Sequence, residues 1–205
     1  MLVDVAGATF WTDASGEGAP LVFVHGLALD HRLWAPQLAK FRDQYWVLAY
    51  DKRGAGLSSP PTEPHSHAED LAALLRHFKI GNAHVIAASD GTVHALELAL
   101  AHPGLVRSLT LVDCSVTPAP TLHEHLSDIT APTLILVGER DLPENHQRAA
   151  LLAERLPRAL QRVLPGEGHL PNPADPRAFN AALAQFLESL PWRDGEAALD
   201  TNSDA

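Results

Sequence analysis

The chain has 205 residues, of which 46% are hydrophobic and 20% are charged, and its formal net charge is −10 at pH 7. These fractions are typical of a globular protein and exclude a disordered main body. The acidic balance and the lack of any cluster of Lys and Arg exclude nucleic acids and anionic membrane surfaces as expected partners.

Cysteine usage and the lack of targeting signals favour a cytoplasmic protein. Cys114 is the only cysteine, so an intrachain disulfide and a cysteine-rich metal site are both impossible. The first residues lack a basic region followed by a long apolar run, and no stretch approaches the roughly 18 consecutive apolar residues of a membrane helix. We expect one domain over residues 1–190 and an acidic, flexible tail over residues 191–205, with the oligomeric state left open.

Short apolar runs rich in β-branched residues alternate along the chain with helical patterns. This alternation predicts an α/β fold, with a mostly parallel sheet of about eight strands covered by helices on both faces. The first two strands form an expected antiparallel hairpin at the sheet edge. The expected strands are Leu2–Val5, Thr9–Asp13, Leu21–His25, Tyr45–Asp51, Ala83–Ala88, Ser108–Asp113, Thr133–Val137 and Leu160–Leu164. The expected helices are His67–Phe78, Gly91–Ala101, Glu144–Leu156 and Asp175–Leu190.

Ser89 stands where an expected strand passes directly into an expected helix. A serine on such a sharp turn has its hydroxyl exposed, and small residues are needed two positions before and after it, as in the pattern G-x-S-x-G. Here the sequence reads Ala87-Ala88-Ser89-Asp90-Gly91, with Ala in place of the first Gly. Two interpretations are open for this motif alone: a catalytic nucleophile, or a serine that caps the helix N-terminus.

Three further segments have the order and spacing of one family. His25-Gly26-Leu27 follows the third expected strand, Asp51-Lys52-Arg53-Gly54-Ala55-Gly56-Leu57-Ser58 follows the fourth, and Gly166-Glu167-Gly168-His169 follows the last. Together with the serine motif they resemble the α/β-hydrolase superfamily, from about Thr9 to Leu190, and within it the small esterases and lactonases related to 3-oxoadipate enol-lactonase. A hydroxyl needs a base to become nucleophilic, and the resemblance implies that Ser89 is paired with His169.

The resemblance also implies an acid and an oxyanion hole. Asp141, after the strand at Thr133–Val137, has the family's usual position for the acid that orients the histidine. Asp113 is the main competitor and Glu139 a weaker third. The backbone N–H groups of Leu27 and Asp90 are the expected oxyanion donors.

Asp90 and the remaining histidines allow other interpretations. The Asp90 carboxylate could bind an ammonium group of the substrate, or could simply complement the helix dipole. We expect the pairs His65/His67 and His123/His125 to have no acidic or cysteine partners around them, so neither a metal site nor a cofactor is expected.

Only about seventeen residues, from Ser115 to Ala131, fill the place where this family usually carries a helical cap. They have room for one short helix, Thr121–Ser127, and leave an open cleft. We therefore expect a serine carboxylic-ester hydrolase that acts on small-molecule esters through an acyl-enzyme, prefers short-chain or activated esters, and has side acyltransferase activity. An amino-acid-ester or lactone hydrolase is the alternative, and a non-catalytic ligand-binding protein is another.

Overall fold

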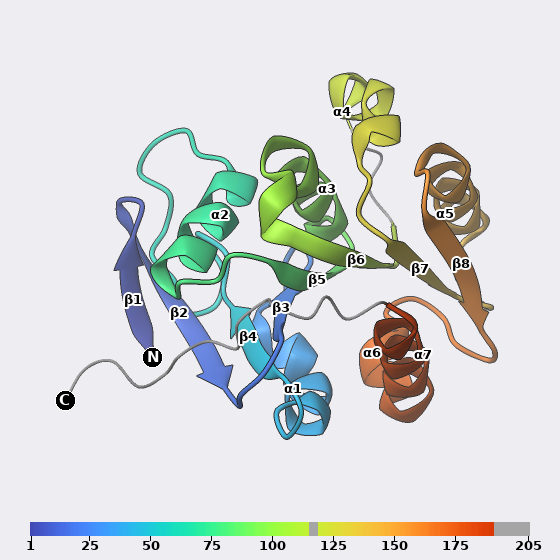
Figure 1. Ribbon diagram of the computed structural model, residues 1–205, viewed down its shortest axis with the longest axis horizontal. Coiled ribbons are helices and arrows are strands. Elements are labelled where there is room, and N and C mark those ends of the chain that lie inside the picture. Colours follow the sequence, from blue (N-terminus) through green and yellow to red (C-terminus); the bar gives the residue numbers. More distant parts are fainter. Residues whose placement is uncertain (115–118, 191–205) are drawn as a thin grey trace.

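A computed structural model describes residues 1–114 and 119–190 of the chain, which form a central sheet between two layers of helices (Figure 1). The strand order is β1-β2-β4-β3-β5-β6-β7-β8. The pairs β1–β2 and β2–β4 are antiparallel, and every other pair is parallel. The strands are β1 (Leu2–Val5), β2 (Ala8–Ser15), β3 (Pro20–Val24), β4 (Trp46–Tyr50), β5 (Ala83–Ala88), β6 (Val106–Val112), β7 (Thr133–Gly138) and β8 (Ala159–Leu164). The expected mostly parallel sheet of about eight strands is confirmed.

Two hydrophobic clusters fill the space between the sheet and the helices. One contains side chains of α2 (His67–His77), α3 (Gly91–Ala101) and α5 (Pro143–Arg155), and the other contains side chains of α1 (Ala35–Phe41) and α7 (Pro176–Ser189). Figure 1 shows these two groups of helices on opposite faces of the sheet. The central strands β4, β5 and β7 are buried along their whole length, as their apolar composition predicts.

The sequence patterns placed most boundaries within two residues and missed the shortest helices. Helix α1, the short α6 (Pro171–Ala174) and the 3-10 helix His31–Trp34 were not expected. Each has seven residues or fewer, which is too short for a repeated apolar spacing to be recognised. Helix α1 is nevertheless held firmly, because Leu38 and Phe41 pack into the hydrophobic cluster on that face.

The cap region is short, as expected. Its described part carries α4 (Pro120–Glu124) and a 3-10 helix at Leu126–Asp128, where one helix over Thr121–Ser127 was expected. The expected tail and residues 115–118 lie outside the described residues. Within the described ranges, no helix is long and apolar enough to cross a membrane.

A buried histidine in the sheet gives the protein a pH-dependent stability. His84 on β5 is buried, its Nδ1 lies 2.7 Å from Ser108 Oγ, and burial, with a smaller contribution from Arg107, lowers its pKa to about 3. Below pH 6.5 the unfolded state binds a proton on this histidine, whereas the folded state does not. The contribution of His84 to the stability is therefore complete above pH 6.5 and is lost as the pH falls toward 3.

We expect His84→Gln to weaken this pH dependence. In urea unfolding series between pH 6.5 and 4, the slope of the unfolding free energy should fall by about 1 kcal/mol per pH unit, the contribution of one proton. The exposed His77 on α2 supplies the control, and His77→Gln should leave the slope unchanged. Equal slopes in wild type and His84→Gln would contradict the assignment.

Candidate active site

Ser89 occupies a strained turn at the carboxyl edge of the sheet. It follows β5 directly, has a left-handed backbone with φ 54°, and precedes helix α3. Its backbone N–H donates to the carbonyl of Val112, the last residue of β6, at 2.9 Å. Gly91 is required in this turn, because a Cβ there would lie 2.7 Å from the carbonyl oxygen of His25. The sharp strand-to-helix turn is the local geometry that the sequence motif predicts.

The loop after β3 lies directly against the serine. A Cβ on Gly26 would lie 2.8 Å from the Ser89 Cβ, so only glycine allows this approach. His25 holds the loop in place: its Nδ1 lies 2.8 Å from the Gly26 carbonyl, and its Nε2 accepts the backbone N–H of Lys52 at 2.9 Å. Burial lowers the pKa of His25, which keeps Nε2 available as an acceptor. His25 therefore has a structural role, because it fixes this loop against the turn that follows β4.

His169 lies between two carboxylates at the same sheet edge. Its Nε2 is 3.0 Å from Asp113 Oδ2, and its Nδ1 is 3.5 Å from Asp141 Oδ1. Both carboxylate side chains are fully buried, whereas the imidazole is 51% exposed. Both candidate acids, Asp113 and Asp141, therefore lie beside the histidine. Glu139, the third candidate, instead accepts the backbone N–H of Gly166 at 2.7 Å.

An asparagine links the two carboxylates. The Nδ2 of Asn145, in the first turn of α5, donates to Asp113 Oδ1 at 3.1 Å and to Asp141 Oδ1 at 2.9 Å. Burial and the neighbouring charge of Asp141 raise the pKa of Asp113 to about 7, although His169 acts in the opposite direction. Sequence reasoning missed Asn145, because a polar residue in a helix's first turn is too common to be a signal by itself.

Asp90, immediately after the serine, already has a partner. The Lys52 Nζ donates to Asp90 Oδ2 at 2.8 Å, and His94 Nε2 lies 3.5 Å from the same oxygen. Burial alone would raise the pKa of Asp90, but His94 and Lys52 lower it to about 2. A substrate ammonium would therefore have to compete with Lys52 for this carboxylate. Lys52 was missed as a site residue, since its distance from Asp90 in sequence hides the contact.

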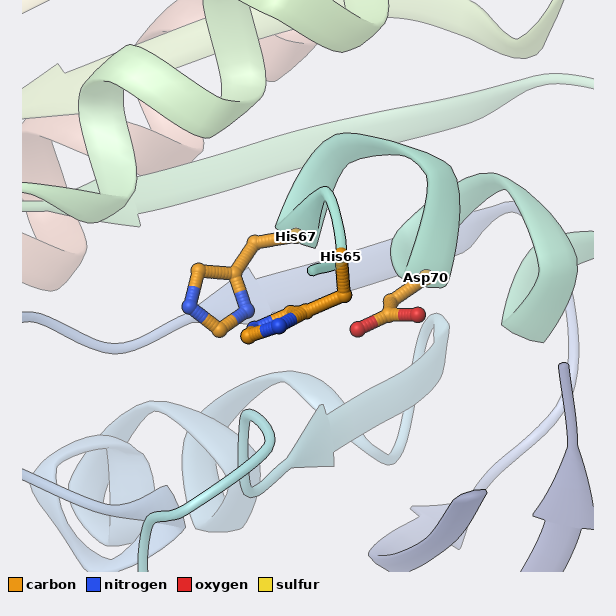
Figure 2. A group of neighbouring side chains, drawn as sticks. All are labelled: His65, His67 and Asp70. Carbon is orange, nitrogen blue, oxygen red and sulfur yellow. The ribbon is translucent and has the colours of Figure 1, made fainter. Parts of the chain in front are cut away.

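The interpretation that the histidine pairs lack acidic partners is wrong. Figure 2 shows Asp70 beside His65 and His67, and their ligand atoms lie within 4.8 Å of one another. Likewise, His125 Nδ1 lies 3.0 Å from Asp128 Oδ2. Both oxygens of Asp70, however, accept hydrogen bonds of 2.7 Å from Arg53, which supplies the positive charge that a metal ion would bring. The sequence already places Glu69 and Asp70 within three residues of His67, and these acidic neighbours were overlooked.

A cavity of about 300 Å³ adjoins the oxyanion loop. Its lining includes Gly26 and Leu27 of that loop together with Lys52, His67 and Asp90. Leu27, whose backbone N–H is an expected oxyanion donor, is 75% exposed. The cavity thus connects the expected oxyanion hole with the Lys52–Asp90 ion pair.

Comparisons with known proteins agree with this architecture. The sequence profile of the alpha/beta hydrolase fold family matches residues 19–127. The chain is 31% identical to 2-(acetamidomethylene)succinate hydrolase of Mesorhizobium japonicum over 92% of this chain and 69% of that protein. It is 33% identical to 3-oxoadipate enol-lactonase 1 of Acinetobacter baylyi over 55% of this chain and 44% of that protein.

A solved structure described as Est816, an N-acyl homoserine lactone degrading enzyme, is 25% identical. It superposes with a TM-score of 0.81 over 91% of this chain and 100% of that one. The profile covers more than half of the chain, and the first of these relatives aligns along nearly all of it. The chain belongs to the α/β-hydrolase superfamily and is a hydrolase.

Proposed function

We propose that the protein is a serine carboxylic-ester hydrolase in which Ser89 is the nucleophile and His169 the base. The observation that carries the proposal is the position of the His169 imidazole between two buried carboxylates, at the edge where Ser89 occupies its strained turn. A serine hydroxyl activated by a histidine that an acid orients is the arrangement that serine hydrolases use on several folds.

The proposed reaction has two steps. His169 takes the Ser89 proton as Oγ attacks the ester carbonyl, and the backbone N–H groups of Leu27 and Asp90 stabilise the oxyanion. The alcohol then leaves with the proton from His169. Water, activated by the same imidazole, releases the acid from the acyl-enzyme. A second alcohol in place of water would give the side acyltransferase activity.

The two acids have different proposed roles. Asp141 lies on the Nδ1 side of the ring, where the triad acid fixes the tautomer, and we assign it that role. Asp113 contacts Nε2, the atom that must receive the serine proton. The ring therefore has to release Asp113 and turn Nε2 toward Ser89 before reaction. The His169 side chain is half-exposed, which leaves the imidazole room to turn.

The short cap supports a broad preference for short-chain or activated esters. With only α4 and one 3-10 helix in the described part of the cap region, little surface is available to select an acyl chain. The names of two relatives include lactone substrates, and a lactone is a cyclic ester that the same mechanism would open. Lactone hydrolysis is accordingly the second candidate.

A substrate panel tests the proposal. We expect p-nitrophenyl acetate and butyrate to be hydrolysed with higher kcat/KM than the octanoate, and a fluorophosphonate probe to label the protein covalently. A γ-lactone and the matching amide, measured alongside, separate the two candidates. Absence of both turnover and labelling in folded protein would favour a non-catalytic ligand-binding role, and a strong preference for octanoate would contradict the open cleft.

A further inference from the structure

The Lys52–Asp90 ion pair forms part of the wall of the cavity beside the oxyanion loop. Lys52 is 5% exposed in its side chain, and among the described residues Asp90 is its one hydrogen-bond acceptor. An ammonium group has three donors, so two N–H groups of a largely buried cation are left for a ligand. Burying a charge with so few partners is costly unless a ligand or solvent completes its hydrogen bonds.

The negative charge of Asp90 is shared between two bases. His94 approaches the same carboxylate oxygen as Lys52 and also lies 3.3 Å from Glu97. Burial alone would lower the pKa of His94, but the neighbouring carboxylates of Asp90 and Glu97 raise it overall. His67, which also lines the cavity, has its pKa lowered to about 4 by burial and by its cationic neighbours, so it is uncharged at neutral pH. Asp30 and Arg53 also line the cavity, but each has an ion-pair partner of its own, Arg32 and Asp70 respectively. Lys52 is therefore the lining cation whose counter-ion is shared with a second base.

We propose that Lys52 makes this cavity a subsite for a carboxylate group carried by the substrate. A carboxylate would accept the hydrogen bonds that Asp90 leaves unused, and its charge would complement the ammonium in a poorly solvated place. The volume of about 300 Å³ is at the lower end for small-molecule sites and suits a small polar group. The inference rests on the proposed function and assigns it a substrate class, esters of short dicarboxylic acids.

Three ethyl esters of similar length test this charge preference. They are ethyl butyrate, monoethyl succinate and ethyl 4-aminobutyrate, which end in a methyl, a carboxylate and an ammonium group. Titration of the acid released gives kcat/KM for each. We expect wild type to prefer monoethyl succinate over ethyl butyrate by about tenfold, the effect of one charged hydrogen bond, and to act least on the ammonium ester.

Substitutions at Lys52 and Asp90, which carry opposite charges, should change the succinate-to-butyrate ratio in opposite directions. Lys52→Met should reduce the succinate-to-butyrate ratio to about one, Lys52→Arg should retain part of it, and Asp90→Asn should raise it, since a repulsive charge is removed. The double variant Lys52→Met/Asp90→Asn removes both charges together and should again give a ratio near one. The exposed Lys40 on α1 is the control, and Lys40→Met should leave all three esters unaffected.

The outcomes separate this inference from the proposed function. An unchanged ratio in a folded Lys52→Met variant that still hydrolyses ethyl butyrate would overturn the subsite and leave the esterase intact. A preference for the ammonium ester that Asp90→Asn abolishes would assign the cavity to Asp90 instead. If no ester is hydrolysed, the affinities of succinate and of butyramide, each measured by titration calorimetry, still test the carboxylate subsite. Succinate must bind more tightly than butyramide, and this difference in affinity must disappear in Lys52→Met.

Discussion

Replacing Ser89 with Ala is expected to lower kcat for p-nitrophenyl butyrate by about 10⁵- to 10⁶-fold, the loss seen when a serine nucleophile is removed from a triad. The expectation follows from the turn that Ser89 occupies, where its left-handed backbone follows β5 and Gly26 and Gly91 leave room for the close approach of the oxyanion loop. Alanine keeps that turn and removes only the hydroxyl. Fluorophosphonate labelling should be lost together with turnover.

Ser189 at the end of α7 offers a matched control. Its hydroxyl donates to the carbonyl of Phe186 at 2.7 Å, in an exposed position at the end of the helix. Ser189→Ala should keep both turnover and labelling. A residual activity of more than a few per cent in Ser89→Ala, after removal of contaminating esterases, would require another nucleophile and would contradict the proposed mechanism.

Replacing Asp141 with Asn is expected to reduce kcat by about 10⁴-fold, because an amide favours the wrong tautomer of the histidine. The 3.5 Å contact with Nδ1 and the full burial of this carboxylate carry the assignment. Asp113→Asn should lower kcat by at most about 10²-fold, because Asp113 contacts Nε2 and not Nδ1. This smaller loss would come from a disturbed resting position of the His169 imidazole. The reverse order of losses would make Asp113 the triad acid.

Stability measurements check the environment of Asp113 independently of activity. The pKa of Asp113, raised to about 7 by burial and by Asp141, means that the folded state holds a proton that the unfolded state releases above pH 3.8. Wild type therefore loses stability from this group as the pH rises from about 4 to 7. Asp113→Asn should become more stable relative to wild type across that range. Asp43→Asn, at an exposed position, should not change the pH dependence.

The sequence by itself determined the fold class and proposed the positions of the candidate site. Continuous apolar runs specify strands buried on both faces, and the residues directly after those runs gather at one sheet edge because parallel strands end together. Ser89 could be named for this reason, whereas Asp113, Asp141 and His169 were named because the motifs around them resemble those of the α/β-hydrolase superfamily. The short helices at His31–Trp34 and α1 could not, because tertiary burial stabilises them more than any repeated local pattern does.

Only the tertiary structure decided which side chains share a site. Both acids reach His169, because β6 and β7 are neighbours and Asn145 draws their carboxylates together. Lys52 meets Asp90 across 38 residues of sequence, since β4 and β5 flank β3 in the sheet. Strand order is settled by long-range packing, and a charge pair between two strand ends leaves no periodic signal along the chain. Composition and spacing therefore place groups at the edge, while the sheet topology sets their distances.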